Sequence, residues 1–255
     1  MAGNERTVVK YLLTRQGIIT LRHIGRLDRI EGPSRHGHLV TIGSEDEVTP
    51  DQSGKKADIF LNGKGVSIKQ SGSVFLFNRL QRSELLKVFS RLNFHDPNRT
   101  VGGLDSLVTE FHEGRLSRRD RPWSEGFQRE SFRRLLRYLM MEGSPNLGES
   151  VYPADFILTA PPKSLSDEAI SVQSFDEYFE EHEREIYLSI RRSWIGQSSN
   201  TEHKRAISIS SKPGNDAWVF TTIAGSPRSW RPVAEVPIEA RRTVYMIFIS
   251  VVPQN

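Results

Sequence analysis

The stretch "ADIFLNGKGVSIKQ" (residues 57–70) holds two short runs of alternating apolar and polar residues with a glycine-rich turn between them. This alternation is typical of two neighbouring strands in a β-hairpin. A two-residue turn at Gly63 and Lys64 suits type II′, because glycine tolerates the backbone angles of its first position. Pairing around that turn places Asp58 opposite Lys69.

The two faces of the predicted hairpin differ in chemistry. One face is wholly apolar and must be buried; it carries Ile59, Leu61, Val66 and Ile68. The opposite face carries Asp58, Phe60, Ser67 and Lys69. Charges held beside a buried layer are costly, so an acid and a lysine there indicate chemistry. The alternative is a cross-strand surface ion pair, which contributes only ~0.5 kcal/mol.

The 255-residue chain has the composition of a globular protein, with 36% hydrophobic and 26% charged residues. It contains no cysteine, which excludes disulfides and thiolate metal sites. No apolar run approaches the ~20 residues of a membrane span, and charges interrupt the N-terminal stretch where a signal peptide needs an apolar core. We therefore expect a cytosolic protein without a membrane partner.

Strands and helices are mixed along the chain without strict alternation, which predicts one α/β or α+β domain over residues 1–255. The sequence predicts a strand at 39–43 and helices at 6–13, 78–92, 124–141 and 174–196. A loop-rich insertion is expected at about 142–167, and a β-rich C-terminal portion at 204–252.

The segment "AD…VSIK" resembles the active-site hairpin of the PD-(D/E)xK nucleases, in the variant where serine replaces the second acid. The resemblance covers about 30 of the 255 residues. Ala57 stands where that family has proline, which is not a ligand. The resemblance implies a restriction-endonuclease-like fold, in which a central mixed β-sheet is flanked by helices.

The same resemblance implies a Mg²⁺ site and a set of catalytic residues. Asp58 and the main-chain carbonyl of Ile68 would bind the metal through hard oxygen ligands. Lys69 would orient or deprotonate the attacking water, with Ser67 in the place of the missing acid. In related enzymes a glutamate on the following helix supplies the missing carboxylate, which here would be Glu84.

Two other acids are alternatives for the carboxylates of the predicted metal site. Glu5 lies on the predicted first helix, and related nucleases also use a glutamate there. A literal Pro50-Asp51 pair precedes the hairpin, in a polar loop. Asp51 is therefore the alternative to Asp58 as the metal-binding acid of the motif.

Basic residues are concentrated where DNA contacts would be needed. Residues 115–137 carry eight arginines against three acids, and phosphate binding accounts for such an excess better than solubility does. From this segment we expect phosphate contacts by Arg118, Arg119 and Arg133. Base-edge contacts are expected from Arg79, Gln81 and Arg82, and further contacts from the 226–232 loop through Arg228 and Arg231.

Together these features predict a Mg²⁺-dependent, sequence-specific endonuclease that cuts double-stranded DNA. The resemblance implies a type II restriction enzyme of a restriction-modification system, located in the prokaryotic cytosol. A homodimer is expected, because twofold symmetry supplies one active site for each strand. The alternatives are a repair or structure-selective nuclease of the same fold, and a non-catalytic DNA-binding regulator.

Overall fold

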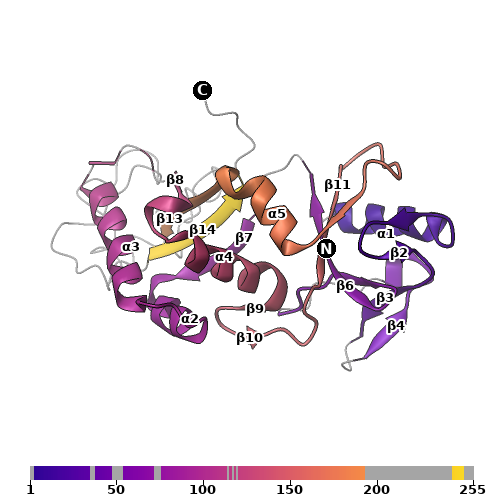
Figure 1. Cartoon of the computed structure of the whole chain (residues 1–255), viewed down its shortest axis with the longest axis horizontal. Coiled ribbons are helices and arrows are strands. Elements are labelled where there is room, and N and C mark those ends of the chain that lie inside the picture. Colours follow the sequence, from indigo (N-terminus) through magenta and orange to yellow (C-terminus); the bar gives the residue numbers. More distant parts are fainter. Residues whose placement is uncertain are drawn as a thin grey trace, which may run out of the picture. The chain divides into compact units, whose positions relative to one another are not determined.

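The computed structural model describes residues 3–34, 38–47, 54–71, 76–113, 115–116, 118, 120–192 and 243–249 (Figure 1). The chain divides into two compact units, where the sequence predicts one domain. The first unit comprises Met1–Asn78, Phe132–Ile186 and Phe248–Asn255, and the second comprises Arg79–Ser131 and Tyr187–Ile247. No described helix is long and apolar enough to cross a bilayer.

A six-stranded sheet forms the centre of the first unit. Its strands, in spatial order, are β12 (Ser171–Gln173), β11 (Phe156–Ala160), β6 (Lys64–Gln70), β5 (Ile59–Leu61), β3 (Ile30–Pro33) and β4 (Leu39–Thr41). The pair β6–β11 is parallel, and the other neighbouring pairs are antiparallel. The protein is therefore of the α+β class with a mixed sheet, as the sequence predicts.

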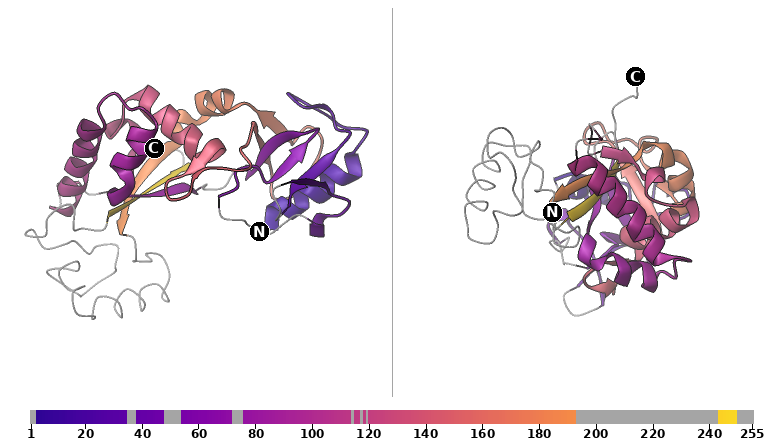
Figure 2. Two further views of the ribbon diagram at one scale, coloured as in Figure 1. Left: turned by 90° about the horizontal axis from the view of Figure 1, so that it is seen from below. Right: turned by 90° about the vertical axis from the view of Figure 1, so that its left-hand side faces the viewer.

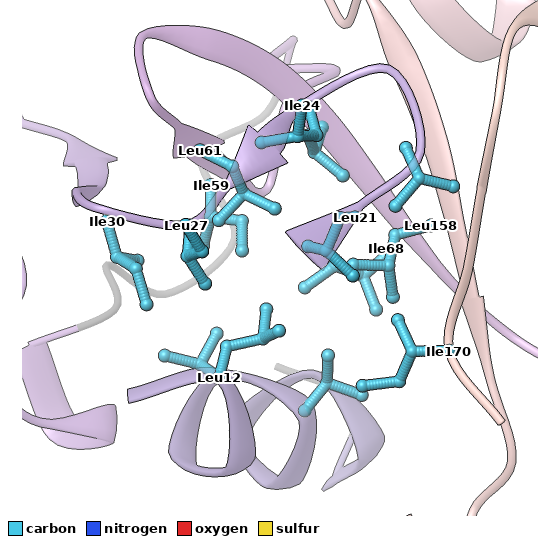
Figure 3. Close-up of a cluster of buried hydrophobic side chains, with 14 of the residues drawn as sticks. Leu12, Leu21, Ile24, Leu27, Ile30, Ile59, Leu61, Ile68, Leu158 and Ile170 are labelled. Atoms are coloured by element: carbon cyan, nitrogen blue, oxygen red, sulfur yellow. The ribbon is translucent and has the colours of Figure 1, made fainter. Parts of the chain in front are cut away.

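Helix α1 (Gly3–Arg15) packs on one face of this sheet, as its side view in Figure 2 shows. Its residues Val8, Val9 and Leu12 join a cluster of buried side chains that includes the apolar face of the hairpin. Figure 3 shows Leu12 facing Ile59 and Ile68 across this cluster. The predicted helix at 6–13 and the predicted apolar hairpin face are both confirmed.

The first unit also contains several shorter elements around the sheet. They are β1 (Thr20–Leu21), β2 (Gly25–Arg26), a 3₁₀ turn at Glu45–Glu47, a π-helix at Tyr138–Glu142, β9 (Gly143–Ser144), β10 (Gly148–Glu149), α5 (Phe175–His182) and a 3₁₀ turn at Glu183–Glu185. Helix α4 (Arg129–Arg137) carries the chain from the second unit into the first. Helix α5 begins with a reciprocal capping box between Ser174 and Glu177, which satisfies two orphan backbone amides.

The described part of the second unit contains a four-stranded sheet and two helices. The strand order is β7 (Leu76–Gln81), β14 (Thr243–Ile249), β13 (Ile186–Arg192) and β8 (Asp120–Pro122). Helix α2 (Leu85–Arg91) follows a 3₁₀ turn at Arg82–Glu84, and a further 3₁₀ turn lies at Trp123–Glu125. Helix α3 (Pro97–His112), capped by the Asp96 side chain, was not predicted from the sequence.

Three predicted elements differ in the structure. The first part of the predicted helix 78–92 is strand β7, because it pairs with β14 more than 160 residues later in the chain. The predicted helix 174–196 ends at His182, and the strand β13 follows. The predicted loop-rich insertion 142–167 contains β11, a central strand of the first sheet.

The other predicted elements are only partly described. The predicted helix 124–141 consists of a 3₁₀ turn, α4 and the π-helix. Strand β14 lies in the predicted β-rich portion 204–252, and the rest of that portion lies outside the described residues.

Candidate active site

The hairpin turns one residue earlier than the sequence predicts. Asn62 and Gly63 occupy the turn with φ angles of 50° and 79°, as a type I′ turn requires at both positions. Phe60 therefore pairs with Gly65, and Ile59 with Val66. The predicted turn at Gly63 and Lys64 is wrong, but the pairing moves by two positions, so every side chain keeps its predicted face.

The new register changes the partner of Asp58. The observed pairing ends with Ile59 opposite Val66, and Lys69 lies three residues beyond Val66 on β6. The Asp58 amide donates to the Val66 carbonyl at 2.8 Å. One Asp58 carboxylate oxygen accepts from the Ile68 amide at 2.7 Å and from the Ser67 hydroxyl at 3.5 Å. The predicted direct pairing of Asp58 with Lys69 is wrong.

The polar face of the hairpin is largely shielded from water. Ser67 is only 1% exposed, and Asp58 and Lys69 are each half-buried. Strand β11 pairs with β6 on its other edge, with Ile157 beside Ser67 and Thr159 beside Lys69. This shielding strengthens electrostatic interactions between the charged groups.

Glu5 of helix α1 interacts electrostatically with charged residues of the hairpin. Burial raises the pKa of Glu5, and the negative charge of Asp58 raises it further. The positive charges of Lys55 and Lys69 act in the opposite direction on the same pKa. Glu5 is therefore electrostatically coupled to both charged residues of the predicted motif, although more than fifty positions separate it from them in the sequence.

Lys56 is a residue of this site that the sequence analysis missed. Its ammonium donates to the main-chain carbonyl of Leu139, at 2.7 Å, within the π-helix. Burial lowers the Lys56 pKa to about 8, the charge of Lys69 lowers it too, and the charge of Asp58 opposes them. Its spacing of two residues from Asp58 was the available sequence signal, because such residues share one side of an extended chain.

The oxygen atoms of this site suit a small divalent cation. Asp58 and Glu5 provide two carboxylates, and Ile68 provides a carbonyl on the same edge of β6 as the amide that Asp58 binds, because the N–H and C=O of one strand residue point the same way. Mg²⁺ commonly binds through one or two carboxylates and keeps several waters. Within the described part of the chain, no three His, Asp or Glu side chains gather closely enough to hold a metal by themselves.

Glu84 and Asp51 are the other acids that the sequence predicts for the metal site. Glu84 precedes α2 in the second unit and is half-buried. Asp51 lies outside the described residues. Of the alternatives that the sequence left open, only Glu5 has an electrostatic interaction with Asp58 among the described residues.

The predicted DNA-contacting residues have varied surroundings. Arg79 lies in β7, and Gln81 and Arg118 are exposed. Arg133 forms an ion pair with Asp176 at 2.8 Å. Arg119, Arg228 and Arg231 lie outside the described residues.

Arg82 is held inside the second unit. Its guanidinium makes two hydrogen bonds to Asp105, at 3.0 and 2.6 Å, and the two side chains are only 18% and 17% exposed. This pair uses two of the five guanidinium N–H donors and gives Arg82 a structural role. No family model matches the chain, and no curated protein or solved structure matches it either.

Proposed function

We propose that this protein is a Mg²⁺-dependent endonuclease that hydrolyses phosphodiester bonds in double-stranded DNA, in the manner of a type II restriction enzyme. The observation that carries the proposal is the shielded polar face of the hairpin, where the half-buried Asp58 and Lys69 flank the buried Ser67 and Asp58 binds the Ile68 amide at 2.7 Å. The electrostatic interaction of Glu5, from α1, with both charged residues supports it. Two acids and a lysine from separate elements thus interact electrostatically, and ionisable groups with perturbed pKa values cluster at functional sites.

The fold adds support to the proposal. The resemblance in the sequence implies a central mixed sheet flanked by helices. Strands β5 and β6 are the two inner strands of a six-stranded mixed sheet, and α1 covers the apolar face. This arrangement holds the side chains of Asp58 and Lys69 on rigid elements, which catalytic geometry needs.

Each group of the site has a role in phosphodiester hydrolysis. Asp58, Glu5 and the Ile68 carbonyl would hold the metal, which would neutralise charge on the phosphate and activate the attacking water. Lys69 orients that water and stabilises the negative charge that develops on the phosphate oxygens. A water oxygen forms a bond to phosphorus, the bond to the leaving sugar oxygen breaks, and the water's proton finally resides on the leaving oxygen.

The test is incubation of the purified protein with phage DNA and Mg²⁺, followed by gel electrophoresis. Discrete fragments are expected from the wild type, and none from Asp58→Asn, Lys69→Met or the wild type in EDTA. Glu149→Gln, an exposed acid of the same unit, serves as the matched control and should cut like the wild type. A continuous smear would favour a nuclease that does not require a defined sequence.

One observation favours a second function. The bond from the Ile68 amide to Asp58 completes backbone hydrogen bonding where the β5–β6 pairing ends, so Asp58 has an architectural role as well. In a non-catalytic DNA-binding regulator, that role would be its only one. Such a protein would retard DNA in a gel without cutting it, and its DNA binding would be insensitive to Mg²⁺.

A further inference from the structure

We propose that Asn62 is a site of spontaneous deamidation, and that the contacts of the hairpin turn with residues 23–29 hold the reaction back in the folded protein. Asn62 and Gly63 form the only Asn-Gly pair of the chain. They are also the two central residues of the hairpin turn, where their φ angles are 50° and 79°. The inference is independent of the proposed nuclease activity, because it concerns the chemistry and packing of this turn alone.

Deamidation begins when the backbone nitrogen that follows an asparagine attacks the side-chain carboxamide. Here the Gly63 nitrogen, after losing its proton to hydroxide, forms a bond to the carboxamide carbon of Asn62. The bond from that carbon to the side-chain nitrogen breaks, and ammonia leaves after taking up a proton from water. A water molecule then opens the cyclic imide at either carbonyl and gives aspartate or isoaspartate. Overall one water is consumed and one ammonia is released, without oxidation or reduction.

The attacking nitrogen is accessible to solvent. Gly63 is exposed, and it has no side chain that could hinder the attack. Within the described part of the chain, no hydrogen bond uses the Gly63 amide. The chemistry of residues 62 and 63 therefore favours the reaction, and only their conformation can oppose it.

The type I′ turn keeps the two reacting atoms apart. Closure of the five-membered imide requires the Gly63 nitrogen and the Asn62 Cβ to lie on the same side of the Cα–C bond of Asn62. In the left-handed conformation, Cβ lies next to the residue's own carbonyl oxygen. The following nitrogen is on the opposite side of that planar carbonyl carbon, so it points away from the side chain. Asn62 has to leave the turn conformation before the ring can form.

Hydrogen bonds to main-chain groups of residues 23–29 hold the Asn62 side chain in place. Its oxygen accepts from the amides of Asp28 and Arg29, each at 3.0 Å. Its nitrogen donates to the carbonyls of Arg26 and Ile24, at 2.7 and 3.5 Å. Because both ends of the carboxamide are bound, rotation of Asn62 into the reactive conformation requires the turn to separate from these residues.

Lys64 provides a second connection between the hairpin turn and residues 23–29. Its ammonium donates to the His23 carbonyl at 2.6 Å, and the residue is exposed. Lys64→Met therefore weakens the attachment of the turn without altering the two residues that react. Lys10→Met is the matched control, because Lys10 is an exposed lysine of α1 whose ion pair, with Glu45 at 3.0 Å, belongs to other elements.

Asn93 provides an internal comparison within the same chain. It also has a left-handed backbone, with a φ of 52°. The next residue, however, is Phe94, whose side chain hinders the attack and whose amide donates to the Phe89 carbonyl at 3.0 Å. We expect Asn93 to convert much more slowly than Asn62 when the chain is unfolded, because only the local sequence then matters.

Either product weakens the hairpin turn. Aspartate at position 62 has no N–H to donate to the Arg26 carbonyl, and it places a charged oxygen beside it. Isoaspartate adds a methylene group to the main chain, which a two-residue type I′ turn does not accommodate. The converted protein should therefore have a lower urea midpoint than the unconverted protein.

The first experiment follows conversion of Asn62 in the full-length wild type by peptide mass spectrometry at mildly alkaline pH, in native buffer and in guanidinium chloride that unfolds the chain. We expect Asn62 to convert in the denaturant. In native buffer the rate should fall on the order of a hundredfold, because at least three hydrogen bonds of ordinary net strength must first break. Failure of Asn62 to convert faster than Asn93 in the denaturant would overturn the assignment of the site, and equal rates at Asn62 in the two buffers would overturn the control by folding.

The second experiment compares Lys64→Met and Lys10→Met with the wild type in native buffer. Conversion of Asn62 should be several-fold faster in Lys64→Met, and it should keep the wild-type rate in Lys10→Met. A wild-type rate in Lys64→Met would contradict the role of residues 23–29. Because the first experiment uses the unaltered chain, it decides the inference even if Lys64→Met does not fold.

Discussion

The carboxylate of Asp58 accepts the backbone N–H of Ile68 at 2.7 Å, at the point where the pairing of β5 with β6 ends. The Asp58 carboxylate therefore accepts the hydrogen bond that a main-chain carbonyl of β5 would accept if the pairing continued. This contact separates the two roles of Asp58, because an amide oxygen can accept the same hydrogen bond without carrying a charge.

We expect Asp58→Asn to retain most of the free energy of unfolding and to lose cleavage. Asp58→Ala should lose cleavage and also lower the free energy of unfolding by about 1–3 kcal/mol, since it leaves a shielded amide without its acceptor. Urea denaturation and the DNA cleavage assay measure the two effects. Full cleavage by Asp58→Asn would remove Asp58 from the catalytic site.

Glu5→Gln should stabilise the protein at neutral pH. The folded-state pKa of Glu5 is raised above 4.5, so the folded state binds more protons than the unfolded state between 4.5 and the raised value. Stability is therefore lost as the pH rises through that window, and above it the cost is complete. The urea midpoint of Glu5→Gln should exceed that of the wild type at pH 7, and the two should converge below pH 4.5.

The control for this prediction is Glu149→Gln, an exposed acid whose replacement should leave the urea midpoint nearly unchanged. Cleavage provides the second half of the test. Glu5→Gln should abolish it if Glu5 completes the metal site, whereas Glu84→Gln should retain it. The reverse result would assign the third carboxylate to Glu84.

Arg82→Ala should lower the free energy of unfolding by about 2 kcal/mol or more, because Asp105 would remain partly buried without its partner. Asp105→Asn should cause a loss of similar size. The exposed Arg118 is the matched control, and Arg118→Ala should change the urea midpoint little. A stable Arg82→Ala protein with altered base preference would instead support the base contact predicted from the sequence.

Asn62→Ala should destabilise the protein by about 2–3 kcal/mol. The Asn62 side chain accepts from the amides of Asp28 and Arg29, each at 3.0 Å, and donates to the Arg26 carbonyl at 2.7 Å. Alanine loses these bonds and also disfavours the φ of 50°. Asn62→Gly relieves the backbone strain alone, so it should recover only a small part of the loss in thermal or urea denaturation.

The sequence alone predicted what depends on neighbouring residues. The alternation in 57–70 assigned Asp58, Ser67 and Lys69 to one face and Ile59 to the other, because side chains alternate in any extended strand. The helix predicted at 6–13 also lies within α1 (Gly3–Arg15). These patterns involve only neighbouring residues, so a wrong prediction in another segment of the chain does not affect them.

The position of the hairpin turn was beyond local information. Gly63 can begin a type II′ turn or end a type I′ turn, and both keep two residues in the loop. Bonds from Asn62 to Asp28 and Arg29, more than thirty positions earlier, favour the type I′ turn. That choice paired Ile59 with Val66, so Lys69 lies beyond the end of the pairing with β5 and is not opposite Asp58.

Tertiary structure alone decided which strands pair and which distant groups join the site. Strand β7 was predicted as helix because its partner β14 follows more than 160 residues later, and β11 was predicted as loop because its pairing with β6 supplies the order that its own sequence does not. Glu5 meets the hairpin through the packing of α1, and Lys56 is anchored by a carbonyl of the π-helix. Local patterns determine which way a side chain points, but the energy of burying and pairing charges depends on neighbours that only the folded chain brings together.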